Sequence, residues 1–112
     1  MIINVASMLG LIGVSPELPS PAYVTSKHAV IGLTKTDGIF YGKKGVRINA
    51  ICPGYVATPL LMKHVNTPKM NAELERVPLG RLAKMEEIAD AIVFLASPMS
   101  SFMCASALVV DG

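Results

Sequence analysis

The sequence contains no tryptophan, and phenylalanine and tyrosine together make up only 5% of its 112 residues. Charge is scarce too, since charged residues account for 16% and the formal net charge is +2. The basic residues are scattered, and only Lys43 and Lys44 are adjacent. Because nucleic-acid binding needs a clustered basic face, this composition argues against a nucleic-acid partner.

Cysteine is also rare. Cys52 and Cys104 are too few for a disulfide framework or a cysteine-based metal cluster, and we expect both to be small buried residues. The two histidines, His28 and His64, lack the carboxylate or cysteine spacing of a metal site. The sequence therefore predicts neither a disulfide nor a bound metal.

Long apolar runs are missing, and none approaches the ~18 residues that cross a bilayer. The apolar stretch 1–14 lacks the basic segment of a signal peptide, and Asn4 and Ser7 interrupt it. We therefore expect a cytoplasmic protein with no membrane partner. Hydrophobic residues nevertheless make up 52% of the chain, which is a high share for one small domain. This share indicates either strands that are buried on both faces or a surface that a partner covers.

The predicted elements alternate between strand and helix. Strands are predicted at residues 2–6, 46–51 and 107–110, and helices at 21–42 and 85–97. Pro21 and Gly42 mark the ends of the long helix, whereas 8–21 and 55–83 are rich in glycine or proline and are predicted to be irregular. This order is typical of a parallel α/β sheet, in which right-handed crossovers place the three strands side by side.

The long predicted helix carries two stripes of side chains. One stripe consists of Tyr23, Lys27, Val30, Thr34 and Tyr41, and the other, called the outer stripe below, consists of Ala22, Ala29, Leu33 and Phe40. A helix on the surface of a monomer usually has a single apolar stripe. Two stripes indicate that this helix is covered on both sides.

Tyr23 and Lys27 are four residues apart and therefore share one face of this helix. A nearby ammonium group favours the phenolate form and lowers the pKa of a tyrosine, so the pair can exchange a proton near neutral pH. The same spacing also arises by chance in ordinary amphipathic helices, so the pair alone fits a plain surface contact equally well.

Ser7 follows the first predicted strand, and Pro53, Gly54 and Thr58 follow the second. Ligands of open parallel sheets bind at the carboxyl ends of the strands, so the Ser7 hydroxyl is a candidate for holding a substrate oxygen. The alternatives are a loop serine that bonds its own backbone and, at 53–59, a plain turn. Ser7 lacks the Gly-x-Ser-x-Gly setting of a hydrolase nucleophile.

Taken together, these segments resemble the short-chain dehydrogenase/reductase family in their order along the chain. The matching segments are 3–7, 23–27, 46–54, 78–81, 86–97 and 109–112, with Val56 and Thr58. The resemblance covers essentially the whole chain and implies the last three strands of a Rossmann-like, doubly wound parallel sheet with their helices. It also implies that residues 1–112 form one incomplete domain, with Met1 inside the fifth strand of a complete relative.

The resemblance implies NAD(P)-dependent oxidation of a small alcohol or reduction of a ketone. In this interpretation Ser7 orients the substrate oxygen, and Tyr23 is the catalytic acid/base. Lys27 lowers the pKa of Tyr23 and holds the nicotinamide ribose. The resemblance further implies a homo-oligomer, in which the helix at 21–42 packs against its counterpart in a second subunit.

The resemblance also assigns the contacts on the nicotinamide side of the cofactor. Pro53 and Gly54 would pack against the nicotinamide, the Val56 backbone would bond its carboxamide, and Thr58 would contact the carboxamide or a phosphate. Residues 60–77 would form a mobile substrate lid.

The chain departs from the family in three ways. It holds no glycine-rich phosphate loop, it has extra residues at 15–19 between Ser7 and Tyr23, and it stops at Gly112 where relatives run on. NAD or NADP would then keep only nicotinamide-side contacts, so we expect the isolated chain to bind cofactor at millimolar strength or weaker. The alternative function is a truncated, non-catalytic remnant or interaction module.

Overall fold

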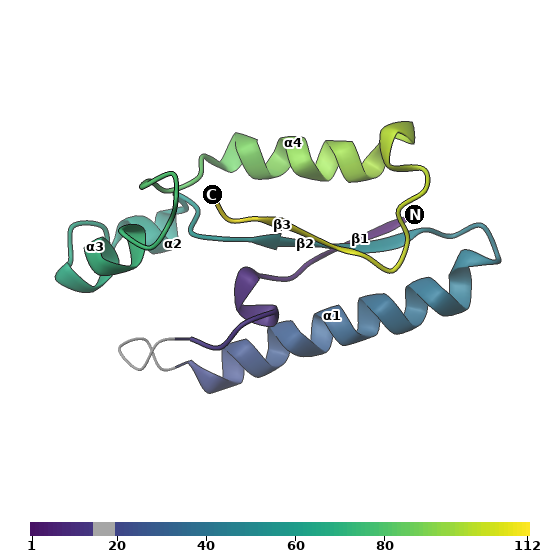
Figure 1. Ribbon diagram of the computed structural model, residues 1–112, viewed down its shortest axis with the longest axis horizontal. Coiled ribbons are helices and arrows are strands. Elements are labelled where there is room, and N and C mark those ends of the chain that lie inside the picture. The colour runs from purple at the N-terminus through teal and green to yellow at the C-terminus, as the bar shows by residue number, and fades with distance from the viewer. Residues whose placement is uncertain (15–19) are drawn as a thin grey trace.

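A three-stranded parallel sheet lies between two helices in the computed structural model, which describes residues 1–14 and 20–112. The strands are β1 (Ile2–Val5), β2 (Ile48–Pro53) and β3 (Ala107–Val110), and they lie in this order. Figure 1 shows α1 (Pro21–Gly42) on one face of the sheet and α4 (Met85–Ala96) on the other. The predicted parallel α/β architecture is therefore confirmed.

The helix α1 has the predicted bounds, because Pro21 stands in its first turn and the chain leaves it after Gly42. The second strand, however, begins two residues later than predicted. Val46 is still part of the helix exit, where its N–H donates to the Tyr41 carbonyl at 3.2 Å. The strand extends instead to Pro53, whose missing N–H is tolerated at the end of a strand.

Strand β2 is the centre of the core, because both of its faces are covered. One buried cluster, facing α1, consists of Ala6, Ile31, Ala50 and Cys52, and the other, facing α4, consists of Ile51, Ile88 and Leu95. Each fully buried aliphatic side chain contributes ~1.5–3 kcal/mol to folding. Cys52 is buried as predicted, whereas Cys104 is only half-buried.

Helix α1 packs on the sheet through Ile31, Thr34 and Gly38. Gly38 permits the closest approach, since a Cβ at this position would lie 2.7 Å from the Ala105 Cα. On the outer stripe, Leu33 is 57% exposed and Phe40 is 62% exposed. This chain alone therefore leaves the outer stripe uncovered.

The prediction that residues 55–83 are irregular is wrong. This segment contains α2 (Pro59–Met62) and α3 (Pro68–Leu74). Each helix starts at a threonine followed by a proline: the Thr58 hydroxyl accepts the Leu61 N–H, and the Thr67 hydroxyl accepts the Met70 N–H. The two prolines open helical turns here rather than interrupting them.

The extra length expected at 15–19 lies outside the described residues. Across residues 1–14 and 20–112, no helix is long and apolar enough to cross a membrane. Within the same ranges, no group of three His, Cys, Asp or Glu side chains could hold a metal ion.

Candidate active site

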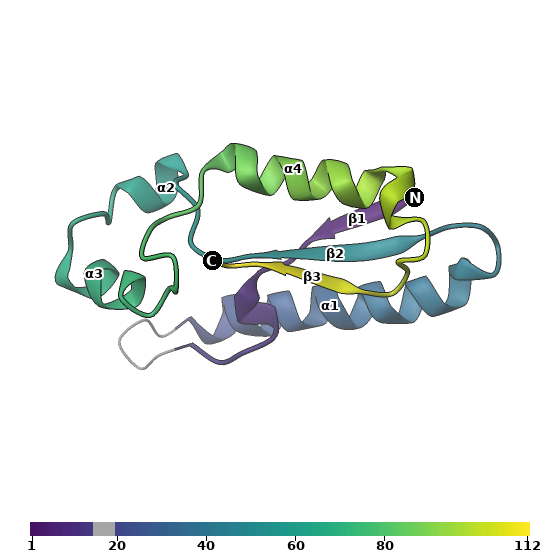
Figure 2. The same cartoon turned by 45° about the horizontal axis from the view of Figure 1, so that its top comes forward.

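One cleft at the carboxyl end of the sheet brings together all the residues that the sequence singles out. Ser7, Tyr23, Lys27, Pro53, Gly54, Val56 and Thr58 all line this cleft, which has a volume of about 520 Å³. Figures 1 and 2 show why: η1 (Met8–Gly10), the start of α1 and helix α2 all lie at this end of the strands. We call this space the catalytic cleft, after the role that we propose for it below.

Ser7 stands where β1 gives way to the 3₁₀-helix η1. Its side-chain oxygen accepts the Leu9 N–H at 3.2 Å and so caps that helix. Ser7 therefore does bond the local backbone, as one of the two interpretations expected, but its side-chain oxygen only accepts in this bond. The hydroxyl proton stays available for a ligand in the catalytic cleft.

Lys27 joins the end of β1 to Tyr23. Its Nζ donates to the Val5 carbonyl at 3.0 Å and lies 5.5 Å from the centre of the Tyr23 ring. Tyr23 itself is 46% exposed at the cleft. An ammonium group has three donors, so the bond to Val5 leaves two for other partners.

Gly10 holds η1 close to α1 and was missed by sequence reasoning. A Cβ at Gly10 would lie 2.7 Å from the Lys27 carbonyl oxygen and 2.8 Å from Ile31 Cδ1. Its position three residues after Ser7, in a loop that returns to the helix, is the only signal in the sequence. Gly10 thereby sets the spacing between Ser7 and Lys27.

The turn after β2 forms the opposite wall of the cleft. Gly54 is required there because a Cβ would lie 2.7 Å from the Asp111 Cα. Val56 pairs with Ala83 in a parallel bridge, whose bonds run from Ala83 N to the Tyr55 carbonyl and from Ala57 N to the Ala83 carbonyl. Neither bond uses the Val56 N–H, which therefore faces away from Ala83.

Thr58 and α2 complete this wall. The Thr58 side-chain oxygen accepts the Leu61 N–H at 3.3 Å, so its hydroxyl proton can still be donated. Leu60, Leu61 and His64 also line the cleft. His64 lacked any motif in the sequence, and it lies just past α2, where its N–H donates to the Leu61 carbonyl at 2.9 Å.

Cys52 is buried beside the backbone N–H of Ser7 and is not among the residues that line the catalytic cleft. Burial raises the pKa of its thiol, and this effect outweighs the backbone N–H of Ser7, which lowers it. The thiol therefore stays protonated.

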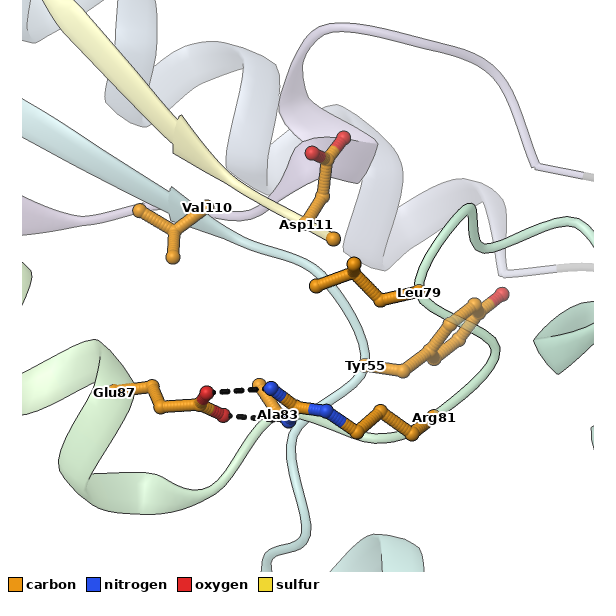
Figure 3. A pocket seen from close by; sticks show the side chains of 8 residues that line it. Tyr55, Leu79, Arg81, Ala83, Glu87, Val110 and Asp111 are labelled. Carbon is orange, nitrogen blue, oxygen red and sulfur yellow. Dashed lines mark hydrogen bonds and ion pairs between the residues drawn. The ribbon is translucent and has the colours of Figure 1, made fainter.

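Two smaller pockets adjoin the catalytic cleft, and Tyr55 lines all three. The second pocket, of about 310 Å³, shares Met8, Leu9 and Tyr55 with the cleft. The third pocket, of about 90 Å³, is shown in Figure 3, where Arg81 and Glu87 pair at 2.7 Å. Arg81 lowers the pKa of Glu87 to about 2.

The comparisons agree on one group of enzymes. A family model described as enoyl-(acyl carrier protein) reductase matches residues 1–112. Cyclohexanol dehydrogenase of Acinetobacter sp. (strain SE19) is 43% identical over 112 residues, which cover 99% of this chain and 41% of the relative.

Solved structures give the same result. A structure from Agrobacterium tumefaciens assigned to a 2-deoxy-D-gluconate 3-dehydrogenase, with bound NADP, has a TM-score of 0.91 and 38% identity. A 4-hydroxyisoleucine dehydrogenase complexed with NADH has a TM-score of 0.88 and 32% identity. Each match covers 98% of this chain and 44% of the solved one. The chain thus spans about two fifths of the length of the curated relatives it matches.

Proposed function

Because this chain belongs to the short-chain dehydrogenase/reductase family, we propose that its catalytic cleft serves NAD(P)-dependent interconversion of an alcohol and a carbonyl compound. The observation that supports this most strongly is the convergence of the seven predicted residues on one cleft. They come from the residues that follow β1, from α1, and from the end of β2 with the turn after it, which are far apart in sequence.

The donors of the cleft suit the nicotinamide end of NAD or NADP. The Val56 N–H, which the bridge to Ala83 does not use, would bond the carboxamide. Pro53 and Gly54 would pack on the ring, and the Thr58 hydroxyl would donate to the carboxamide or a phosphate. The bound cofactor would supply or accept the hydride.

The remaining residues would handle the proton. The Ser7 hydroxyl would donate to the substrate oxygen, and Tyr23 would give that oxygen its proton during reduction or remove it during oxidation. Lys27, anchored on the Val5 carbonyl, keeps two donors for the ribose and for the Tyr23 oxygen. Its fixed position beside Tyr23 would stabilise negative charge on the phenol oxygen.

For the substrate we propose a ring alcohol or cyclic ketone. Cyclohexanol dehydrogenase and two further relatives, 40% and 41% identical, are named for alcohols of six-membered rings. Apolar side chains from η1 and α2 line the cleft: Met8, Leu9, Leu60 and Leu61. A compact apolar ring would remove this surface from water without leaving a charge unpaired.

We also propose that α1 mediates homo-oligomerisation. The exposed outer stripe, with Leu33 and Phe40, offers an apolar face of the kind that a second subunit covers. The alternative function, an interaction module without catalysis, would use this same face. The two functions differ in whether the cleft binds nicotinamide.

A titration monitored by NMR tests the proposed function on the chain as it stands. Nicotinamide mononucleotide carries the nicotinamide and its ribose but no adenine. Because the isolated chain is expected to bind weakly, we expect the mononucleotide to shift the amide resonances of Val56 and Thr58 saturably only when it is titrated through the millimolar range. Adenosine monophosphate is the matched control and should leave them unchanged. Equal shifts with both nucleotides, or none with nicotinamide mononucleotide, would exclude a nicotinamide site and favour the interaction module.

A further inference from the structure

Tyr55 connects the turn after β2 to helix α3. Its hydroxyl donates to Glu73 Oε2 at 2.9 Å, across 18 residues of sequence. Glu73 is held in turn by Arg76, whose Nη1 lies 3.0 Å from Glu73 Oε1. Both oxygens of the Glu73 carboxylate therefore have partners. One accepts from Tyr55 in the turn, and the other pairs with Arg76, which follows the end of α3.

We propose that Tyr55 and Glu73 are positioning residues, whose hydrogen bond fixes the wall between the catalytic cleft and the second pocket by tying the turn after β2 to α3. The cofactor role of that turn rests on the proposed function. The contact itself rests only on the geometry of Tyr55, Glu73 and Arg76.

The environment of the bond makes it stronger than a surface contact. The Glu73 side chain is only 12% exposed, whereas that of Arg76 is 62% exposed. Burial and the Glu73 carboxylate raise the pKa of Tyr55 to about 12, and Arg76 opposes this to a smaller extent. The other charged residues that line pockets together with Tyr55 are Lys27, Arg81, Glu87 and Asp111. The phenol therefore remains a donor over the whole neutral range.

The position of Tyr55 in the turn explains how the bond can act on the cleft. Its carbonyl accepts the Ala83 N–H at 2.9 Å, so its backbone is held on one side and its ring on the other. The next residue, Val56, carries the N–H proposed to bond the cofactor. The Tyr55 carbonyl and the Val56 N–H belong to one planar peptide group, so loss of the Glu73 bond would leave this group held by Ala83 alone.

The same bond separates the two larger cavities. Tyr55 and Leu9 line both the catalytic cleft and the second pocket, whereas Glu73, Arg76 and Val77 line only the second pocket. If α3 moved away from the turn, the two spaces would merge. The bond therefore fixes how far a substrate in the cleft can extend toward α3.

Hydrogen exchange of the cofactor-free chain tests this proposal. We expect Glu73→Met and Tyr55→Phe to raise the amide exchange rates of α3 and of the bridge amides Ala57 and Ala83 together, by about tenfold. Glu73→Gln, which keeps an acceptor oxygen, should give an intermediate increase. The matched controls, Glu75→Met at the exposed end of α3 and Tyr41→Phe on α1, should leave both regions unchanged.

Faster exchange in α3 with unchanged Ala57 and Ala83 amides would show a local contact and overturn the proposal. If Tyr55→Phe fails to fold, the graded series Glu73→Met and Glu73→Gln decides alone. Because no cofactor enters this experiment, its failure is distinct from that of the proposed function. A titration with nicotinamide mononucleotide that fails while exchange stays coupled would remove the cofactor role and leave the positioning contact.

Discussion

The two ends of the sheet use polar side chains in opposite ways. At the amino end, the Arg47 guanidinium donates to backbone carbonyls in the last turn of α4 and in the segment after it. The acceptors are the carbonyl oxygens of Leu95 at 3.2 Å, Ser97 at 3.5 Å, Ser100 at 2.9 Å and Met103 at 3.2 Å. A cation with this many partners has few donors left and serves the fold.

At the carboxyl end, the polar side chains have hydrogen-bond donors that their contacts with the backbone do not use. Ser7 and Thr58 each accept one backbone N–H, and Lys27 donates once to the Val5 carbonyl. All three residues line the catalytic cleft, so their remaining protons are available to a ligand there. The difference teaches that saturation of hydrogen bonds distinguishes structural polar groups from those that can receive a ligand.

The largest effect on stability is expected at the amino end. Arg47→Met should lower the free energy of unfolding by about 3 kcal/mol, because several buried carbonyls lose a charged donor at once. Urea denaturation followed by circular dichroism measures this loss. Lys35→Met, an exposed cation on α1, is the control and should change stability by less than about 0.5 kcal/mol. Equal losses in both variants would remove the distinction between the two ends.

Gly10→Ala should have the next largest effect. The added methyl group would meet the Lys27 carbonyl and Ile31, so we expect a loss of about 1–3 kcal/mol and a displacement of Lys27 from the cleft. Gly13→Ala is the matched control, since nothing lies within 4 Å of its added Cβ. Thermal unfolding of both variants measures the difference, and a Gly10→Ala protein as stable as Gly13→Ala would show that η1 and α1 are not tightly docked.

Lys27→Met removes a cation at the carboxyl end and is compared with Arg47→Met at the amino end. The bond to the Val5 carbonyl and the exposed contact with the Tyr23 ring are lost, so stability should fall by about 1 kcal/mol, well below the Arg47 effect. The shifts that nicotinamide mononucleotide causes at Val56 and Thr58 should weaken or disappear in this variant. A stability loss as large as that of Arg47→Met would assign Lys27 to the fold instead.

The smallest effect concerns pH and the exposed Arg81–Glu87 pair. The pKa of Glu87 falls from its ordinary 4.5 to about 2, so the pair stabilises the folded chain above pH 4.5. This contribution is lost as the pH falls toward 2. The urea midpoints of the parent and Glu87→Gln should therefore differ at pH 7 and converge at pH 2. Glu86→Gln, in the same turn of α4, should show no such convergence.

The sequence predicted best those features that depend on residues close to one another along the chain or on the order of the strands. Pro21 and Gly42 bounded α1 correctly, and the convergence of Ser7 with the turn at 53–58 followed because carboxyl ends of parallel strands meet at one edge. Prolines misled the prediction for 55–83, because Pro59 and Pro68 open capped helices.

Contacts that depend on tertiary placement could not be predicted. The Tyr55–Glu73 bond joins a turn to a helix whose existence the sequence did not indicate. The close approach of Gly10 to Lys27 likewise depends on how η1 folds back on α1. The Tyr55–Glu73 contact leaves no spacing or periodicity in the sequence, and the place of Gly10 three residues after Ser7 does not by itself indicate a contact with α1.

Turnover in a chimera tests most directly whether the carboxyl end of the sheet carries the proposed chemistry. Residues 1–112 would replace the aligned part of the solved NADP-bound relative, and reduction of cyclohexanone by NADPH would be measured. We expect turnover that falls at least about 100-fold in Tyr23→Phe while NADPH still binds, and that persists in Tyr41→Phe. A folded chimera that binds NADPH but reduces cyclohexanone equally well with and without the Tyr23 hydroxyl would contradict the proposed role of this cleft.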